Sequence, residues 1–84
     1  MHVISRKMLS LFWERYPDSK TALDRWYKLM KTNEFTNFAE LRAVLPSADQ
    51  VGNLIVFNIG GNKYRLIASV HFNRGKIYVR HVLT

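Results

Sequence analysis

Basic side chains without acidic partners dominate the last third of this 84-residue chain. Residues 50–84 contain five lysines and arginines and no aspartate or glutamate, whereas residues 1–49 contain eight basic and six acidic residues. The five are Lys63, Arg65, Arg74, Lys76 and Arg80. A surface of this kind binds polyanions, of which nucleic acid is the first candidate and an acidic membrane or protein the second.

The same segment carries side chains suited to RNA cleavage without a metal ion. In that reaction the 2′-OH of the substrate attacks the adjacent phosphate, so the protein must position the strand, stabilise negative charge and move protons. Lys63, Arg65 and Arg80 suit charge stabilisation, and the phenol of Tyr78 suits proton transfer beside cationic neighbours. Hard metal ions need carboxylate oxygens, which residues 50–84 lack. We therefore predict no metal site and no cofactor.

Histidines and aromatic residues accompany these charges. We predict that Tyr78 and His71 add a stacking surface for bases. The predicted catalytic residues are Arg65, Arg80 and Tyr78, and the predicted RNA-binding residues are Lys63, Lys76, His71 and Arg74. A solvated face that is basic by chance, with His71 as an ordinary exposed residue, stays open as an alternative. His81 is expected on the apolar face in a structural role, and His2 gives no signal.

Three strands with two tight turns must position these side chains: LIVFNI, KYRLIASVHF and KIYVRHVLT, separated by GGN and NRG. Two-residue turns at Gly60-Gly61 and Arg74-Gly75 set the register. The resulting pairs are Phe57 with Tyr64, Ile55 with Leu66, Phe72 with Ile77 and Val70 with Val79. A three-residue second turn would turn Lys76, Tyr78 and Arg80 toward the core, at several kcal/mol for each unpaired charge.

This register divides the sheet into an apolar face and a basic face without acids. The apolar face comprises Ile55, Phe57, Ile59, Tyr64, Leu66, Ala68, Val70, Phe72, Ile77, Val79, His81 and Leu83. The basic face comprises Asn58, Lys63, Arg65, Ser69, His71, Lys76, Tyr78, Arg80 and Thr84, with Leu54, Val56, Ile67 and Val82 between them. The apolar face requires helices to cover it.

The first half of the chain supplies these helices. Ser5 is a candidate cap for a helix from Arg6 to about Tyr16, and Ser19 for a second helix to about Lys31. A short third helix follows the Asn37 and Glu40 capping pair and ends before Pro46. PSADQVGN is expected to be a loop, and HVI at residues 2–4 a short additional strand. The predicted fold is α+β, with a short N-terminal strand and two to three helices on one face of an antiparallel β-meander.

Length and composition limit the classes of protein. The chain is long enough for one hydrophobic core, so residues 1–84 are expected to form a single domain. It has no cysteine, no secretory signal and no apolar stretch near the roughly 20 residues of a membrane span. We expect a cytoplasmic protein without membrane partners.

Several segments resemble HigB-type toxins of the RelE superfamily. They are MHVISRK, FWERYPDSKTALDRWY, PSADQVGN, VFNIGGNKYRLIASV and KIYVRHVLT. The resemblance implies a microbial-RNase-like sheet and a ribosome-dependent mRNA endonuclease, or mRNA interferase, of a type II toxin–antitoxin system. It also implies neutralisation by a HigA-type antitoxin with a helix-turn-helix domain.

The resemblance also implies roles for individual residues. The arginine of KYRL, Arg65, matches the superfamily arginine that contacts the scissile phosphate, and Arg80 matches a basic position in the last strand. Family members usually continue past the Thr84 position into a His-x-Glu-Tyr-Asp-like segment, which would supply proton-transfer residues. The alternative is therefore a non-catalytic or truncated RNA- or ribosome-binding module, and a weaker one is a docking surface for an acidic protein.

Overall fold

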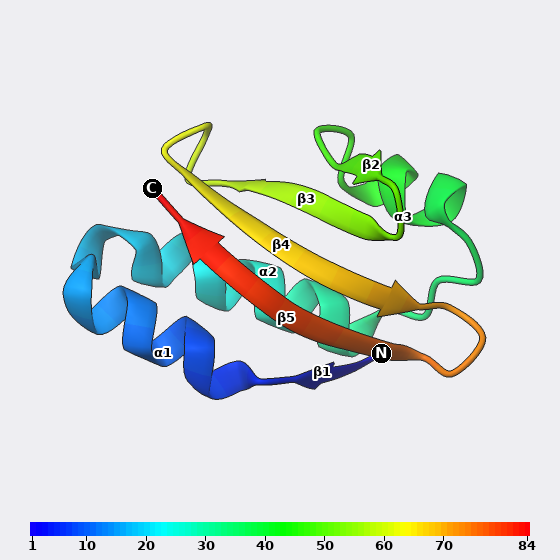
Figure 1. Ribbon diagram of the computed structural model, residues 1–84, viewed down its shortest axis with the longest axis horizontal. Helices are drawn as coiled ribbons and strands as arrows, with labels where there is room; N and C mark the ends of the chain where they lie inside the picture. The colour runs from blue at the N-terminus through cyan, green and yellow to red at the C-terminus, as the bar shows by residue number, and fades with distance from the viewer.

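The computed structural model describes residues 1–84 and has the α+β architecture predicted from the sequence (Figure 1). The elements in chain order are β1 (His2–Ile4), α1 (Arg6–Arg15), the 3₁₀ turn η1 (Pro17–Ser19), α2 (Lys20–Thr32), α3 (Phe38–Val44), β2 (Asp49–Val51), β3 (Leu54–Ile59), β4 (Tyr64–His71) and β5 (Lys76–Leu83). None of the helices has the length and hydrophobicity needed to span a bilayer.

The five strands form one mixed sheet in the order β1-β5-β4-β3-β2. Strands β3, β4 and β5 run antiparallel to one another, as predicted for the meander, and β2 pairs antiparallel with β3. The predicted N-terminal strand is confirmed, and it pairs in parallel with β5, so that the first and last strands of the chain lie side by side (Figure 1). The sheet therefore brings together residues from both ends of the sequence.

Both turns of the meander have four residues, and the predicted two-residue turns are wrong. Ile59 pairs with Tyr64 across the first turn, and His71 pairs with Lys76 across the second. The first turn is longer because Gly60, Gly61 and Asn62 all adopt positive φ, at 62°, 64° and 69°. A four-residue turn shifts the pairing by two positions, so Phe57 faces Leu66, Ile55 faces Ala68 and Val70 faces Ile77. An even shift leaves each side chain on its predicted face.

A β-bulge in β5 changes the faces near the end of the chain. Ala68 pairs with Val79 and Ile67 pairs with His81, so Arg80 has no partner of its own in β4. An extra residue reverses the alternation of side chains beyond it. His81 and Leu83 are consequently exposed on the face without helices, whereas Val82 packs against the core. The predicted core positions of His81 and Leu83, and the predicted outer position of Val82, are wrong.

The segment PSADQVGN is not entirely a loop, because Asp49–Val51 forms the edge strand β2. Asp49 pairs with Val56 and therefore lies on the same face of the sheet as Val56. The prediction of a face without acids is thus wrong at this edge. Two strands, β4 and β3, separate Asp49 from β5, and Asp49 lies at the opposite edge of the sheet from β1.

The helix ends agree only partly with the predicted caps. Asn37 caps α3, with its Oδ1 accepting a hydrogen bond of 2.9 Å from the Glu40 amide, and Glu40 Oε1 accepts from the Thr36 amide at 2.8 Å. Ser5 adopts the left-handed conformation with φ 75°, and its side chain does not cap α1. Ser19 lies in η1 and donates its hydroxyl back to the Tyr16 carbonyl at 2.6 Å. The two serine caps predicted from the sequence are therefore wrong.

Helices α1 and α2 cover one face of the sheet, and β4 and β5 cross in front of α2 in Figure 1. Trp26 packs edge-on against Phe57, with ring centroids 5.3 Å apart. The side chains with no exposed surface are Leu9, Leu23, Met30, Leu41, Leu66, Ala68 and Ile77, together with the Ser19 hydroxyl side chain. The helix-covered face is therefore the hydrophobic core, as the sequence pattern predicts.

The amino group of Met1 closes the C-terminal end of α2. It donates to the carbonyl oxygens of Met30 at 2.8 Å and Asn33 at 2.6 Å, and it lies 3.1 Å from a carboxylate oxygen of Glu34. The last carbonyls of a helix lack partners within the helix and carry partial negative charge. A buried ammonium group at this position satisfies them and fixes the start of β1.

Candidate nucleic-acid interface

The face of the sheet without helices, called the open face below, presents its side chains in rows that cross the strands. From the β4–β5 turn toward the end of β5, one row holds His71 and Lys76 and the next holds Ser69 and Tyr78. After the bulge a row holds Ile67 and His81, and the last holds Asn58, Arg65 and Leu83. The rows follow from the strand register, because directly opposed residues share a face.

Arg65 lies exposed at one end of the open face, on β4 between Asn58 and Leu83. The side chain of Leu83 is 47% exposed, so this part of the face presents a cation beside an apolar surface. No carboxylate pairs with Arg65 in the structure. Its guanidinium group is thus available for a ligand with acceptor oxygens, such as a phosphate.

An aromatic cluster lies near the β4–β5 turn, at the end of β4 and the start of β5. The rings of His71 and Tyr78 meet edge to face with centroids 5.1 Å apart, and Ser69 Oγ lies 3.3 Å from His71 Nε2. The guanidinium carbon of Arg80 lies 5.5 Å from the Tyr78 ring centroid. The bulge therefore leaves Arg80 on the open face as predicted, and it places a cation beside the candidate proton-transfer phenol.

Lys76 and Arg74 lie at the β4–β5 turn end of the open face. Lys76 is half-buried and pairs with His71, whereas Arg74 is exposed within the turn itself. Neither makes an ion pair. The structure therefore groups His71, Lys76, Tyr78 and Arg80 on neighbouring positions, with Arg74 beside them and Arg65 farther along β4.

Lys63 lies elsewhere, and its predicted place on a strand of the basic face is wrong. It belongs to the β3–β4 turn, and its Nζ lies 2.7 Å from Oδ2 of Asp18 in η1. The hydroxyl of Tyr64 donates to the other carboxylate oxygen of Asp18 at 2.5 Å. These hydrogen bonds from Lys63 and Tyr64 hold the pKa of Asp18 below its ordinary value, and the same carboxylate raises the pKa of Lys63.

His2 reaches the open face through the parallel pairing of β1 with β5, which sequence reasoning missed. It pairs with Lys76 and its side chain is exposed. Three residues of β1 carry too little pattern to reveal their partner strand, so no signal in the sequence assigns His2 to this face. No group of three or more potential metal-ligating residues occurs in the structure.

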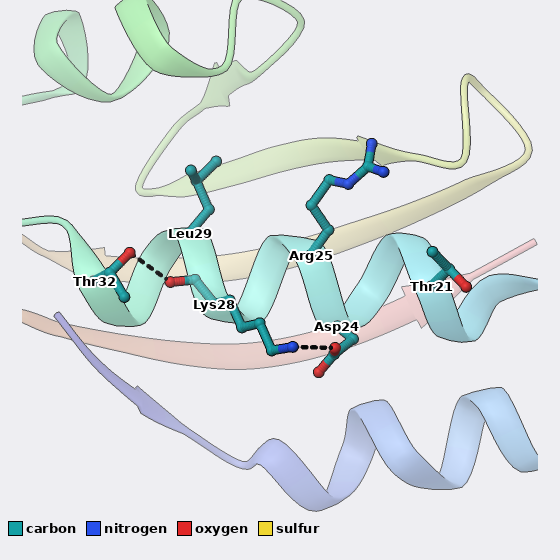
Figure 2. A pocket seen from close by; sticks show the side chains of 6 residues that line it. All are labelled: Thr21, Asp24, Arg25, Lys28, Leu29 and Thr32. Atoms are coloured by element: carbon teal, nitrogen blue, oxygen red, sulfur yellow. Dashed lines mark hydrogen bonds and ion pairs between the residues drawn. The ribbon is translucent and has the colours of Figure 1, made fainter.

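The hollows of the surface lie on the helical side of the molecule. A shallow depression of about 460 Å³ runs along α2 between Thr21 and Thr32 (Figure 2). Lys28 in this depression is paired with Asp24 at 3.0 Å, and Thr32 donates its hydroxyl to the Lys28 carbonyl at 2.8 Å. Asp24, Lys28 and Thr32 are thus paired within α2, which leaves Arg25 as the unpaired charge of this depression, whereas the open face carries several.

Comparison with known proteins identifies the family of the chain. The pattern of the HigB_toxin family, described as the RelE-like toxic component of a toxin–antitoxin system, matches residues 19–84. The chain belongs to the HigB toxin family. A protein of such a system has an antitoxin as its partner.

Three relatives illustrate the similarity. The mRNA interferase toxin HigB of Escherichia coli (strain K12) is 39% identical over 87 residues, covering 100% of this chain and 84% of that protein. The mRNA interferase HigB of Escherichia coli O6:H1 (strain CFT073) is 29% identical over 85 residues, covering 98% of this chain and 82% of that protein. An identical score of 39% is found with the mRNA interferase HigB of Shigella flexneri.

Proposed function

We propose that this protein is the toxin of a toxin–antitoxin system and acts as an mRNA interferase, an endoribonuclease that cleaves messages without a metal ion. The observation that carries the proposal is the line of unpaired cationic and aromatic side chains along β4 and β5, from Arg65 through Arg80 and Tyr78 to Lys76. Family membership and the names of the relatives supply the class of substrate.

The reaction divides among these residues according to their charge. Arg65 contacts the phosphate at the cleaved bond and stabilises the negative charge that grows on its oxygens as the 2′-OH attacks. As the bond between the 2′-oxygen and phosphorus forms, the 2′-OH loses its proton, the P–O5′ bond breaks and the leaving 5′-oxygen takes up a proton. Tyr78 takes part in this proton transfer, and Arg80, 5.5 Å from its ring, stabilises negative charge there. His71, Lys76 and Arg74 hold the flanking strand by phosphate contacts and by stacking.

The proposed substrate, mRNA, implies the ribosome as a partner, and the toxin class implies an antitoxin. We propose that the message is cut on the ribosome, so that the toxin acts in the cytoplasm, and that a HigA-type antitoxin with a helix-turn-helix domain neutralises it. Ribosomal binding would add contacts that the small open face does not provide alone. Lys63 is proposed as a further RNA contact, since its side chain is 66% exposed even in its ion pair.

Arg65→Ala tests the proposed function. Induced expression of the wild type is expected to arrest growth and to cut ribosome-bound messages, and the substitution is expected to reduce cleavage about 100-fold or more, as when one group that stabilises a transition state is removed. Arg42→Ala on α3 removes an exposed arginine distant from the open face and serves as the control. Equal arrest by the wild type and Arg65→Ala would refute the assignment.

A further inference from the structure

Two histidines flank a lysine where the ends of three strands meet. In the sheet order β1-β5-β4, His2 pairs with Lys76 and Lys76 pairs with His71. We call these three residues the His2–Lys76–His71 row. Adjacent strands are about 4.8 Å apart, so the two imidazole-bearing positions are separated by roughly 10 Å with the lysine between them.

The three side chains of the row point to the same side. Val3 and Ile77, the next pair along β1 and β5, are buried in the core, and side chains alternate along a strand. His2 and Lys76 therefore face away from the helices, and the His2 amide donates to the Gly75 carbonyl at 2.8 Å, which fixes the strand beside the turn. His71 is held by its edge contact with Tyr78 and by Ser69.

The surroundings of the row are cationic. Lys76 lies within it, Arg74 lies in the adjoining turn, and Arg80 lies beyond Tyr78 on β5. A carboxylate, that of Glu34, lies beside the adjoining turn: its Oε2 would lie 3.4 Å from a Cβ added at Gly75, and its other oxygen is paired with the Met1 amino group. Asp49 faces Val56 in a different row at the far edge of the sheet. The row thus combines one permanent positive charge with two that depend on pH.

We propose that the His2–Lys76–His71 row is a second phosphate-binding site of the RNA interface and that its affinity increases as the imidazoles become protonated. This inference rests on the proposed function, because it extends the path of the same RNA strand. Arg65 and His71 are six positions apart on β4, a distance of roughly 20 Å at about 3.3 Å for each residue. The row therefore binds a phosphate other than the one at Arg65, and the strand runs along β4 and β5 between them.

The test measures binding of a fluorescent ten-residue 2′-O-methyl oligouridylate, which lacks the attacking hydroxyl and cannot be cut by this reaction. At 0.1 M salt, a phosphate contact that releases about 0.7 counterion contributes about fivefold to affinity. We therefore expect binding by the wild type to be about fivefold to 25-fold tighter at pH 5.5 than at pH 8.0, with a steeper salt dependence at the lower pH. His2→Gln and His71→Gln should each remove part of this difference, and the double variant most of it.

His81→Gln is the comparison variant, because His81 is the third histidine of the same face and lies between the row and Arg65, beside Ile67, without belonging to the row. It should retain the pH dependence, and a loss of pH dependence in His81→Gln instead of the row variants would overturn the inference. A second measurement needs no substitution. In the wild type at pH 6, the oligouridylate should shift the ring NMR signals of His2 and His71 more than those of His81, and unshifted His2 and His71 signals would also overturn it.

The outcomes separate this inference from the function on which it rests. Growth arrest that depends on Arg65, combined with RNA binding that does not change with pH, would refute the second site and leave the toxin activity standing. RNA binding that depends on pH and on the row, without message cleavage, would support the second site and refute the interferase.

Discussion

The carboxylate of Asp18 in η1, between the two long helices, binds both the β3–β4 turn and the first residue of β4. Its carboxylate accepts hydrogen bonds from Lys63 at 2.7 Å and from the Tyr64 hydroxyl at 2.5 Å. The hydrogen bond to Asp18 raises the pKa of Tyr64, with burial as a further cause. A carboxylate whose pKa is lowered by folding stabilises the folded state at any pH above its ordinary pKa. This contribution is lost as the pH falls through the lowered pKa of the folded state.

We predict that Asp18→Asn lowers the melting temperature at neutral pH and that this difference disappears in acid. The ordinary pKa of the group is 3.8, so the wild type should lose the contribution below about pH 4 as the carboxylate becomes protonated. Because the pKa values of Lys63 and Tyr64 are raised, we predict that the wild type also loses stability above about pH 10, where these groups lose their protons. Melting curves of the wild type and Asp18→Asn from pH 2 to pH 11 measure the loss of stability in acid and in base.

The control for this prediction is Asp24→Asn, which removes the exposed ion pair with Lys28 inside α2. Its effect should be smaller, because an ion pair within one helix connects no separate elements and exposed pairs contribute little. A difference between Asp18→Asn and the wild type that stays constant from pH 7 to pH 2 would contradict the account of Asp18.

At the scale of elements, the bulge in β5 determines which side chains reach the open face. We predict that Val82→Asn lowers the free energy of unfolding by about 1–3 kcal/mol, because Val82 is partly buried against the core and lines a hollow with Met8, Leu11 and Phe12 of α1, where a polar group loses contact with water. His81→Asn should change it by less than about 0.5 kcal/mol, as exposed substitutions do. Urea unfolding measures both, and the reverse order would mean that β5 alternates without a bulge.

The same element explains what the sequence could and could not predict. The open-face positions of Arg65, Lys76 and Tyr78 were predictable despite two wrong turn lengths, because a shift by two residues preserves the period of a strand. His81, Val82 and Leu83 were not, since a bulge leaves no mark in a pattern of alternating side chains. The roles of the predicted site residues remain predictions.

The pairing of the outer strands β1 and β2 was the other feature that the sequence did not predict. The hydrophobic spacing of residues 6–31 predicted both long helices, and Asn37 with Glu40 predicted the cap of the third. The edge strand β2 was missed because DQV has no apolar alternation, and the parallel partner of β1 because three residues specify none. Long-range pairings depend on the whole fold, so local propensity does not reveal them.

At the scale of the whole molecule, the buried ammonium of Met1 joins α2, β1 and the loop at Glu34. We predict that a short tag fused before Met1 lowers the free energy of unfolding by about 1–3 kcal/mol relative to the same tag fused after Thr84. The peptide bond removes the charge and leaves one N–H where the ammonium group makes several bonds. Chemical unfolding of the two tagged proteins decides this, and equal stabilities would contradict it.

The pairing of β1 with β5 has a consequence for the time at which the open face is completed. Chains emerge from the ribosome N-terminus first, and β1 finds no partner strand until Lys76–Tyr78 have been made. The row of His2, Lys76 and His71, like the contact between Tyr78 and Arg80, exists only after the residues of β5 have been synthesised. A chain folded in this way cannot complete this face of the sheet until the residues of β5 have left the ribosome.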